Sequence, residues 1–164
     1  MKLKEIDFNN FKYSLVNKNF NGTLVNLFYQ NKIFEFQTPK VIVEDIITRN
    51  EKVYLKLKLQ GTNSSKMFYD RLLEIEKYHN VNIKKNFNTR FDINNLFESV
   101  YFEVKVPFKN SKPHVNVYKD NREVIYETLQ IGQEIICLVE CNNIWINSHL
   151  VPNYHLNVKE IKIV

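Results

Sequence analysis

The chain has 164 residues, 44% of them hydrophobic, which is enough for one core that buries about two thirds of the surface of the unfolded chain. Its 23 basic and 18 acidic side chains give a net charge of +5, compatible with a polyanionic partner but also common in other proteins. Two cysteines exclude a disulfide framework, and the lack of a long apolar run excludes a membrane helix and a signal peptide. We therefore expect one intracellular domain, spanning residues 1–164, that contacts no membrane.

The N-terminal quarter of the chain is predicted to form β-strands. Residues 11–16, 22–30 and 32–37 are β-prone runs separated by asparagine-containing turns. Pro39 ends the third run because proline has no N–H for a sheet hydrogen bond. Residues 41–47 form a further candidate strand.

Residues 52–59 alternate strictly between apolar and polar side chains, as in a strand with one face in a core. The predicted inward residues are Val53, Leu55, Leu57 and Leu59. The opposite face is basic with one aromatic ring, and consists of Lys52, Tyr54, Lys56 and Lys58.

One helix is predicted near residues 65–79, where Asn63 and Ser64 can cap the N-terminus and neither Gly nor Pro occurs. Its apolar stripe has helical spacing and consists of Met67, Phe68, Leu72, Ile75 and either Tyr78 or His79. Residues 81–95 are polar and asparagine-rich, so we expect a long loop there, with a short helical turn at residues 92–97.

The second half of the chain predicts further strands. Residues 113–118 are followed by Asp120-Asn121, a turn pair that indicates a hairpin into residues 122–128. Residues 132–164 give three more runs, separated by Asn142-Asn143 and Pro152-Asn153. Residues 99–107 alternate, and their predicted faces are Val100, Phe102, Val104 and Val106 inward and Tyr101, Glu103 and Lys105 outward. Short strands with one helix are typical of a small barrel or a sandwich.

A zinc-like spacing, C-x3-C-x7-H-x5-H, links Cys137, Cys141, His149 and His155. If both cysteines lie on one strand, they are about 13 Å apart at ~3.3 Å per residue, whereas ligands of one zinc ion lie within about 4 Å of each other. We therefore expect two core cysteines and two surface histidines, without a metal or other cofactor.

No catalytic pattern stands out. Glycine occurs only at positions 22, 61 and 132, so the sequence contains neither a nucleophile elbow nor a phosphate-binding glycine loop. Acidic residues are scattered, without the paired spacing of a two-metal nuclease. We therefore expect that the protein is not an enzyme. The alternative is an enzyme whose metal site cannot be recognised from the spacing of its residues.

Tyrosines and basic residues share the outer faces of several predicted strands. Bases of single-stranded nucleic acid stack on aromatic rings, at about 1–3 kcal/mol each, while Lys and Arg contact the phosphates. The competing interpretation is that Tyr favours strands and that Lys is enriched by an AT-rich gene, which also explains why the chain contains no alanine. The predicted nucleic-acid contacts are Tyr54, Lys56, Lys58, Lys84, Lys85, Arg90, Tyr101, Lys105, Tyr118, Lys119 and Arg122.

The only tryptophan, Trp145, lies between Ile144 and Ile146. Two flanking isoleucines favour a Trp145 side chain that is buried as a core plug, filling the end of the barrel. The alternative is a side chain that points outward, on which a base stacks.

Two short motifs resemble a known family. Residues 36–40 (FQTPK) resemble a strand-ending QTPK signature. Residues 137–146 (CLVECNNIWI) and 156–162 (LNVKEIK) resemble a hydrophobic strand, an Ile-Trp pair and a strand ending in V-K-x-I. Together they resemble the OB-fold single-stranded DNA-binding proteins of large nucleocytoplasmic DNA viruses and related viral groups. That family typically has a glycine and a second tryptophan before the last strand, where this chain has Asn153, Tyr154 and His155.

The strand and helix patterns predict a mainly β fold, a small barrel or sandwich of about 8–10 short strands with one helix near residues 65–79, and the resemblance implies that it is OB-like. The resemblance also implies non-specific binding of single-stranded DNA during viral replication, recombination or repair. We expect this to take place in the host cytoplasm or nucleus, and RNA is a possible second ligand. A homo-oligomer or a replication-protein partner is compatible with this role. The alternative is a structural or interaction β-domain that docks on a replication or virion partner by strand-edge pairing and does not touch nucleic acid.

Overall fold

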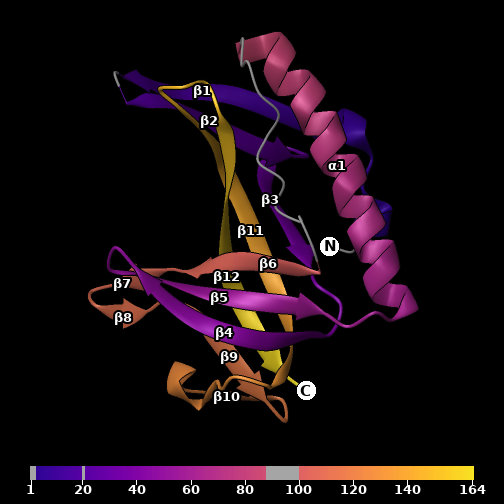
Figure 1. The fold of residues 1–164 in the computed structure, drawn as a ribbon, viewed down its shortest axis with the longest axis vertical. Coiled ribbons are helices and arrows are strands. Elements are labelled where there is room, and N and C mark those ends of the chain that lie inside the picture. Colours follow the sequence, from indigo (N-terminus) through magenta and orange to yellow (C-terminus); the bar gives the residue numbers. More distant parts are fainter. Residues whose placement is uncertain (1–2, 20, 88–99) are drawn as a thin grey trace.

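The computed structural model describes residues 3–19, 21–87 and 100–164 (Figure 1). Ten of its strands form one sheet in the order β1-β2-β3-β11-β4-β5-β6-β12-β9-β10. Their bounds are β1 Phe11–Asn19, β2 Gly22–Tyr29, β3 Lys32–Gln37, β4 Val41–Arg49, β5 Lys52–Leu59, β6 Tyr101–Val106, β9 Asn116–Lys119, β10 Arg122–Val124, β11 Glu134–Asn147 and β12 Pro152–Ile163. Two short strands, β7 Phe108–Lys109 and β8 Lys112–Pro113, form a separate hairpin. The prediction of a mainly β fold with one α-helix is confirmed.

Five of these strands close into a barrel. The ring of neighbours runs from β11 to β4, β5, β6 and β12, and returns to β11. The long strands β11 and β12 continue beyond the barrel, where the far half of β11 pairs with β2. Register shifts after Leu138 and Cys141 bend this long hairpin, because a bulge kinks a strand and increases its twist. The barrel and the β1–β2 extension are therefore joined through β11 and β12.

Four hairpin turns have two consecutive residues with positive φ, as type I′ turns require. They are Gln30-Asn31, Asn50-Glu51, Asn110-Ser111 and Asp120-Asn121. The predicted hairpin at Asp120-Asn121 is confirmed, since β9 and β10 pair across it. Its second strand is shorter than predicted, ending at Val124 before a 3-10 helix at Tyr126–Thr128.

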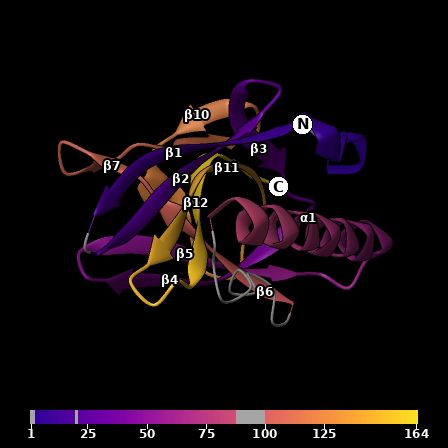
Figure 2. The same ribbon diagram turned by 90° about the horizontal axis from the view of Figure 1, so that it is seen from above.

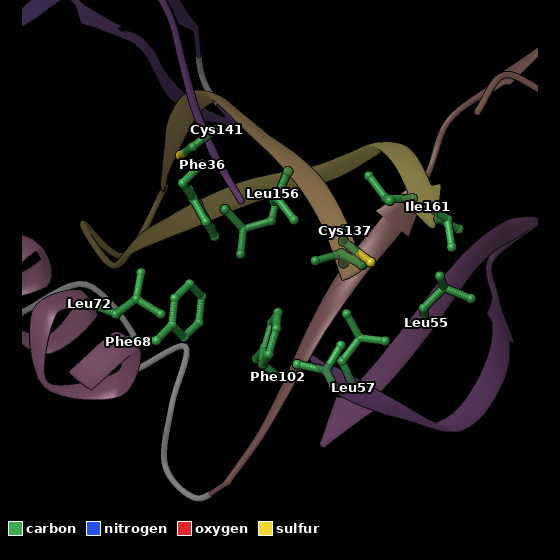
Figure 3. Close-up of a cluster of buried hydrophobic side chains, with 14 of the residues drawn as sticks. Phe36, Leu55, Leu57, Phe68, Leu72, Phe102, Cys137, Cys141, Leu156 and Ile161 are labelled. Atoms are coloured by element: carbon green, nitrogen blue, oxygen red, sulfur yellow. The ribbon is translucent and has the colours of Figure 1, made fainter. Parts of the chain in front are cut away.

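The helix α1 spans Asn63–Phe87 and runs along one side of the strands (Figure 2). Its buried residues include Phe68, Leu72, Ile75, His79 and Ile83. Figure 3 shows Phe68 and Leu72 pointing toward Phe36 of β3 and Phe102 of β6. The Phe68 ring lies 6.0 Å from the Phe36 ring and 6.4 Å from the Phe102 ring. Helix α1 therefore covers the apolar surface between the barrel and β3. None of the described helices is long and apolar enough to cross a membrane.

The end of the helix corrects the sequence prediction. Residues 81–87, for which the sequence predicts a loop, are helical. The reason is burial: Ile83 packs in a second apolar cluster with Val25, Ile144 and Ile146, and this packing outweighs the weak helix propensity of the asparagines around it. The remainder of the expected loop, with the turn at residues 92–97, lies outside the described residues.

Three further expectations are wrong. Met67, assigned to the apolar stripe, is 64% exposed, and Val100, assigned to the core, is 48% exposed. Both lie at the margin of a pattern, where periodicity cannot tell whether a partner covers the side chain. The Asn142-Asn143 pair does not end a strand, because β11 continues through a bulge there. The runs at residues 132–164 are therefore two long strands and not three.

Candidate nucleic-acid interface

Strands β5 and β6 place aromatic and basic side chains on one outer face of the barrel. Leu55 and Leu57 of β5 and Val104 of β6 are fully buried, so the residues that alternate with them point outward. In the antiparallel register Tyr54 lies opposite Lys105 and Lys58 lies opposite Tyr101. We use the name β5–β6 face for the outward residues Lys52, Tyr54, Lys56, Lys58, Tyr101, Glu103 and Lys105 together with Glu44, Asp45 and Arg49 of the adjoining β4.

Basic side chains lie beside both tyrosine rings of the β5–β6 face. Lys56 Nζ lies 5.0 Å and Lys58 Nζ 5.6 Å from the centroid of the Tyr101 ring. Arg49 Cζ lies 4.7 Å from the centroid of the Tyr54 ring. These distances are within the range of cation–π attraction, which holds the rings and the charges beside one another.

The charges on this face do not cancel. Arg49 pairs with Glu103, and Lys58 Nζ lies 3.9 Å from a carboxylate oxygen of Glu44. Among the described residues, no carboxylate lies within ion-pair distance of Lys52, Lys56 or Lys105. Basic residues on the β5–β6 face thus outnumber acidic ones. The basic residues are Arg49, Lys52, Lys56, Lys58 and Lys105, and the acidic residues are Glu44, Asp45 and Glu103.

The β5–β6 face adjoins strand β12. Lys105 lies opposite Asn157, and His155 is two residues before Asn157 on the same outward side. Loss of hydration and the charges of Lys105 and Lys52 lower the pKa of His155. His155 thus places an aromatic ring at the edge of the β5–β6 face.

Tyr118, Lys119 and Arg122 form a separate group on the β9–β10 hairpin. Tyr118 lies opposite Lys162 of β12, five residues along that strand from the partner of Lys105. At ~3.3 Å per residue this is about 16 Å. The structure therefore does not bring these three predicted contacts together with the β5–β6 face.

Lys84 and Lys85 lie in the last turn of α1 and not in a loop. This end of the helix is beside β1 and β2, at the opposite end of the molecule from β4, β5 and β6 (Figure 1). The structure therefore places these two predicted contacts away from the β5–β6 face. Arg90 lies outside the described residues.

The interpretation of Trp145 as a core plug is also corrected. Its neighbours Ile144 and Ile146 are 0% and 2% exposed and belong to the second apolar cluster. Since side chains alternate along a strand, the half-buried Trp145 lies on the other, outward side. The sequence suggested burial of Trp145 because it lies between Ile144 and Ile146. In the structure these two isoleucines point into the core, and Trp145 between them points away from it.

The cysteines and histidines of the zinc-like spacing do not converge. Cys137 and Cys141 are buried in the core, as predicted, and burial raises the pKa of Cys137 to about 12. His149 and His155 are exposed. Thr38 of the QTPK motif instead holds the strand of the cysteines: its N–H donates to the Cys137 carbonyl and its Oγ1 accepts from the Cys137 N–H, both at 2.9 Å.

Sequence reasoning missed Arg49 and His155 as neighbours of this face. Arg49 ends β4 next to the Asn50-Glu51 turn. His155 lies on β12, more than 100 residues after Arg49 in the sequence. The turn beside Arg49 was a usable signal, because a two-residue hairpin places Arg49 opposite Lys52. Nothing in the sequence indicated that β12 lies beside β6.

No protein-family model matches the sequence, and no curated protein matches it significantly. Several solved structures do match. The single-stranded DNA-binding protein of bacteriophage Enc34, in a C-terminally truncated form, has 9% identity and a TM-score of 0.51 over 93% of this chain and 94% of that chain. The Enc34 protein in complex with single-stranded DNA matches with 10% identity and a TM-score of 0.51 over 93% and 95% of the two chains.

A second phage protein gives the same result. It is gp2.5, a single-stranded DNA-binding protein encoded by bacteriophage T7, with 11% identity and a TM-score of 0.51 over 80% of this chain and 86% of that chain. The chain shares their OB-like fold. These neighbours are phage proteins, and none of them connects the chain to the large nucleocytoplasmic DNA viruses named by the sequence resemblance.

Proposed function

We propose that the protein binds single-stranded DNA without strong sequence preference, through the β5–β6 face. The observation that carries this proposal is the convergence of Tyr54 and Tyr101 with five cations on one outer surface of the barrel. The fold supports it, because the phage proteins of similar structure are single-stranded DNA-binding proteins, one of them solved with its DNA.

Each group on the face has a defined role in this proposal. Bases stack on the rings of Tyr54 and Tyr101, while Lys56 and Lys105 contact phosphates. Neither contact reads a base edge, so the sequence of the DNA matters little. Tyr118, Lys119 and Arg122 contact only a strand long enough to continue along β12. The protein is a binding protein without catalytic activity that covers single strands during replication, recombination or repair, and a viral origin remains part of the proposal.

A titration of a fluorescein-labelled dT oligomer, followed by anisotropy at low salt, tests the proposal. We expect saturable binding that weakens steeply with salt, and competition by unlabelled dT but not by a duplex of equal length. An RNA competitor of the same sequence measures the DNA-versus-RNA preference. No binding to any single strand at low salt would refute the proposal and favour a domain that docks on a protein partner.

A further inference from the structure

We propose that Trp145 is a second stacking platform, on which the same DNA strand continues after it leaves the β5–β6 face. This inference rests on the proposed function and extends it to another surface. That surface is the outward side of the paired far halves of β2, β11 and β12, which extend beyond the barrel toward β1 (Figure 1). We call it the Trp145 surface, and its outward residues are Leu24, Asn26, Asn143, Trp145, Asn147, Asn153, His155 and Asn157.

The fold fixes the indole of Trp145 in place. A Cβ atom built on Gly22 would lie 2.7 Å from Cζ2 and 3.0 Å from Cη2 of Trp145, so the six-membered ring packs directly against the Gly22 backbone. Cross-strand neighbours on the outward side are Leu24 and Asn153. An aromatic ring that is already immobilised loses little conformational entropy when a base stacks on it.

The Trp145 surface carries no negative charge that would repel a polyanion. None of the outward residues that define the Trp145 surface carries a carboxylate. The nearest acidic residues on the outer side of β3 and β11 are Glu35 and Glu140, and Lys159 neutralises both, with Nζ–O distances of 2.6 and 3.2 Å. A phosphate that passes this surface therefore meets amide and aromatic groups without an uncompensated negative charge.

The Trp145 surface is continuous with the β5–β6 face. Trp145 lies opposite Asn153 and Asn143 lies opposite His155 on β12, while Asn157 of β12 lies opposite Lys105. Two strand spacings of ~4.8 Å and four residues of ~3.3 Å put Trp145 about 16 Å from Lys105. A single strand of a few nucleotides spans this distance.

The test uses Trp145 as its own reporter, because it is the only tryptophan of the chain. Tryptophan emission and the anisotropy of a labelled dT oligomer are measured in the same titration, with oligomers of increasing length. We expect short oligomers to bind without changing the emission, and longer ones to quench it in proportion to the bound fraction. Trp145→Ala should weaken binding of long oligomers by about 5- to 100-fold and leave short ones unaffected, while Trp145→Phe, which keeps a ring, should lose less.

A charge placed beside the ring gives a test that does not disturb Gly22. Leu24→Glu puts a carboxylate on the Trp145 surface and should weaken binding of long oligomers. Leu15→Glu is the matched control: Leu15 is 56% exposed on β1 and lies opposite the inward-facing Val25, so the same charge is added on the other side of the sheet. This control should bind like the wild type.

Each outcome decides between the two proposals. Binding by anisotropy with unchanged emission at every length would overturn the role of Trp145 and leave the proposed function intact. The role of Trp145 would also be overturned if DNA quenched the emission of the wild type while Trp145→Ala and Leu24→Glu bound long oligomers with wild-type affinity. The emission change would then be indirect. No binding of any single strand would refute the proposed function itself.

Discussion

His79 makes the stability of this protein sensitive to acid. Its side chain is 0% exposed, and the ring centroids of Phe11, Tyr13 and Tyr154 lie 4.5, 5.7 and 5.8 Å from its own. Its Nδ1 lies 2.7 Å from the Tyr13 hydroxyl, and its Nε2 has no hydrogen-bond partner among the described residues. Burial lowers the pKa of His79 to about 3, so the ring stays neutral in the folded protein.

The size of the effect follows from the two pKa values. In the unfolded chain His79 titrates near its ordinary value of 6.5, and in the folded protein near 3. Below pH 6.5 only the unfolded chain takes up this proton, so the free energy of unfolding falls as the pH falls. The loss continues at about 1.4 kcal/mol per pH unit until the folded protein also binds the proton near pH 3. At pH 5 this one group removes about 2 kcal/mol.

Urea unfolding at pH 7.5 and pH 5 measures this loss. His79→Gln keeps a hydrogen-bond acceptor for Tyr13 but does not titrate, so the difference between the two pH values should shrink by about 2 kcal/mol in this variant. His149→Gln, at an exposed position in the turn between β11 and β12, should retain the wild-type difference. An equal loss in the wild type and in His79→Gln would show that His79 does not stay neutral inside the fold.

Three further predictions concern the strands around the proposed site. Gly22→Ala should lower the free energy of unfolding by at least about 1–2 kcal/mol and shift the emission of Trp145, because φ is +150° at this position and the new Cβ would lie 2.3 Å from a carbonyl oxygen of β11. Burial raises the pKa of both Cys137 and Cys141, so neither thiol should react with a disulfide reagent until guanidinium unfolds the protein, and rapid native labelling would contradict the core assignment. Tyr54→Ala should weaken binding of dT by about 5- to 100-fold by anisotropy whereas Tyr54→Phe should not, since stacking needs the ring and not the hydroxyl.

Local periodicity is sufficient to predict the strands of the proposed site. Residues 52–59 and the stretch that forms β6 alternate with period two, so the sequence alone assigns their basic and aromatic side chains to outer faces. The turn at Asp120-Asn121 is predictable for a similar reason, because it depends on two adjacent residues that tolerate positive φ.

The convergence of these faces could not be predicted. The barrel closes through pairs such as Asn157 with Lys105, which are 52 positions apart, and no local pattern encodes such a partner. The helix beyond His79 depends on burial of Ile83 against Val25 of β2, and Trp145 depends on the space that Gly22 leaves. These features arise from tertiary contacts, which override the local propensities that a sequence displays.

The salt dependence of DNA binding tests the central claim most directly. The wild type is compared with Lys56→Gln/Lys105→Gln, which removes two cations from the β5–β6 face, and with Lys66→Gln/Lys77→Gln, which removes two exposed cations from α1. For single strands, each phosphate contact contributes about 0.7 to the slope of log K against log salt. We predict that the first variant has a slope shallower by about 1.4 and a lower affinity, while the second keeps the wild-type slope. Equal slopes for the two variants would contradict the assignment of DNA binding to the β5–β6 face.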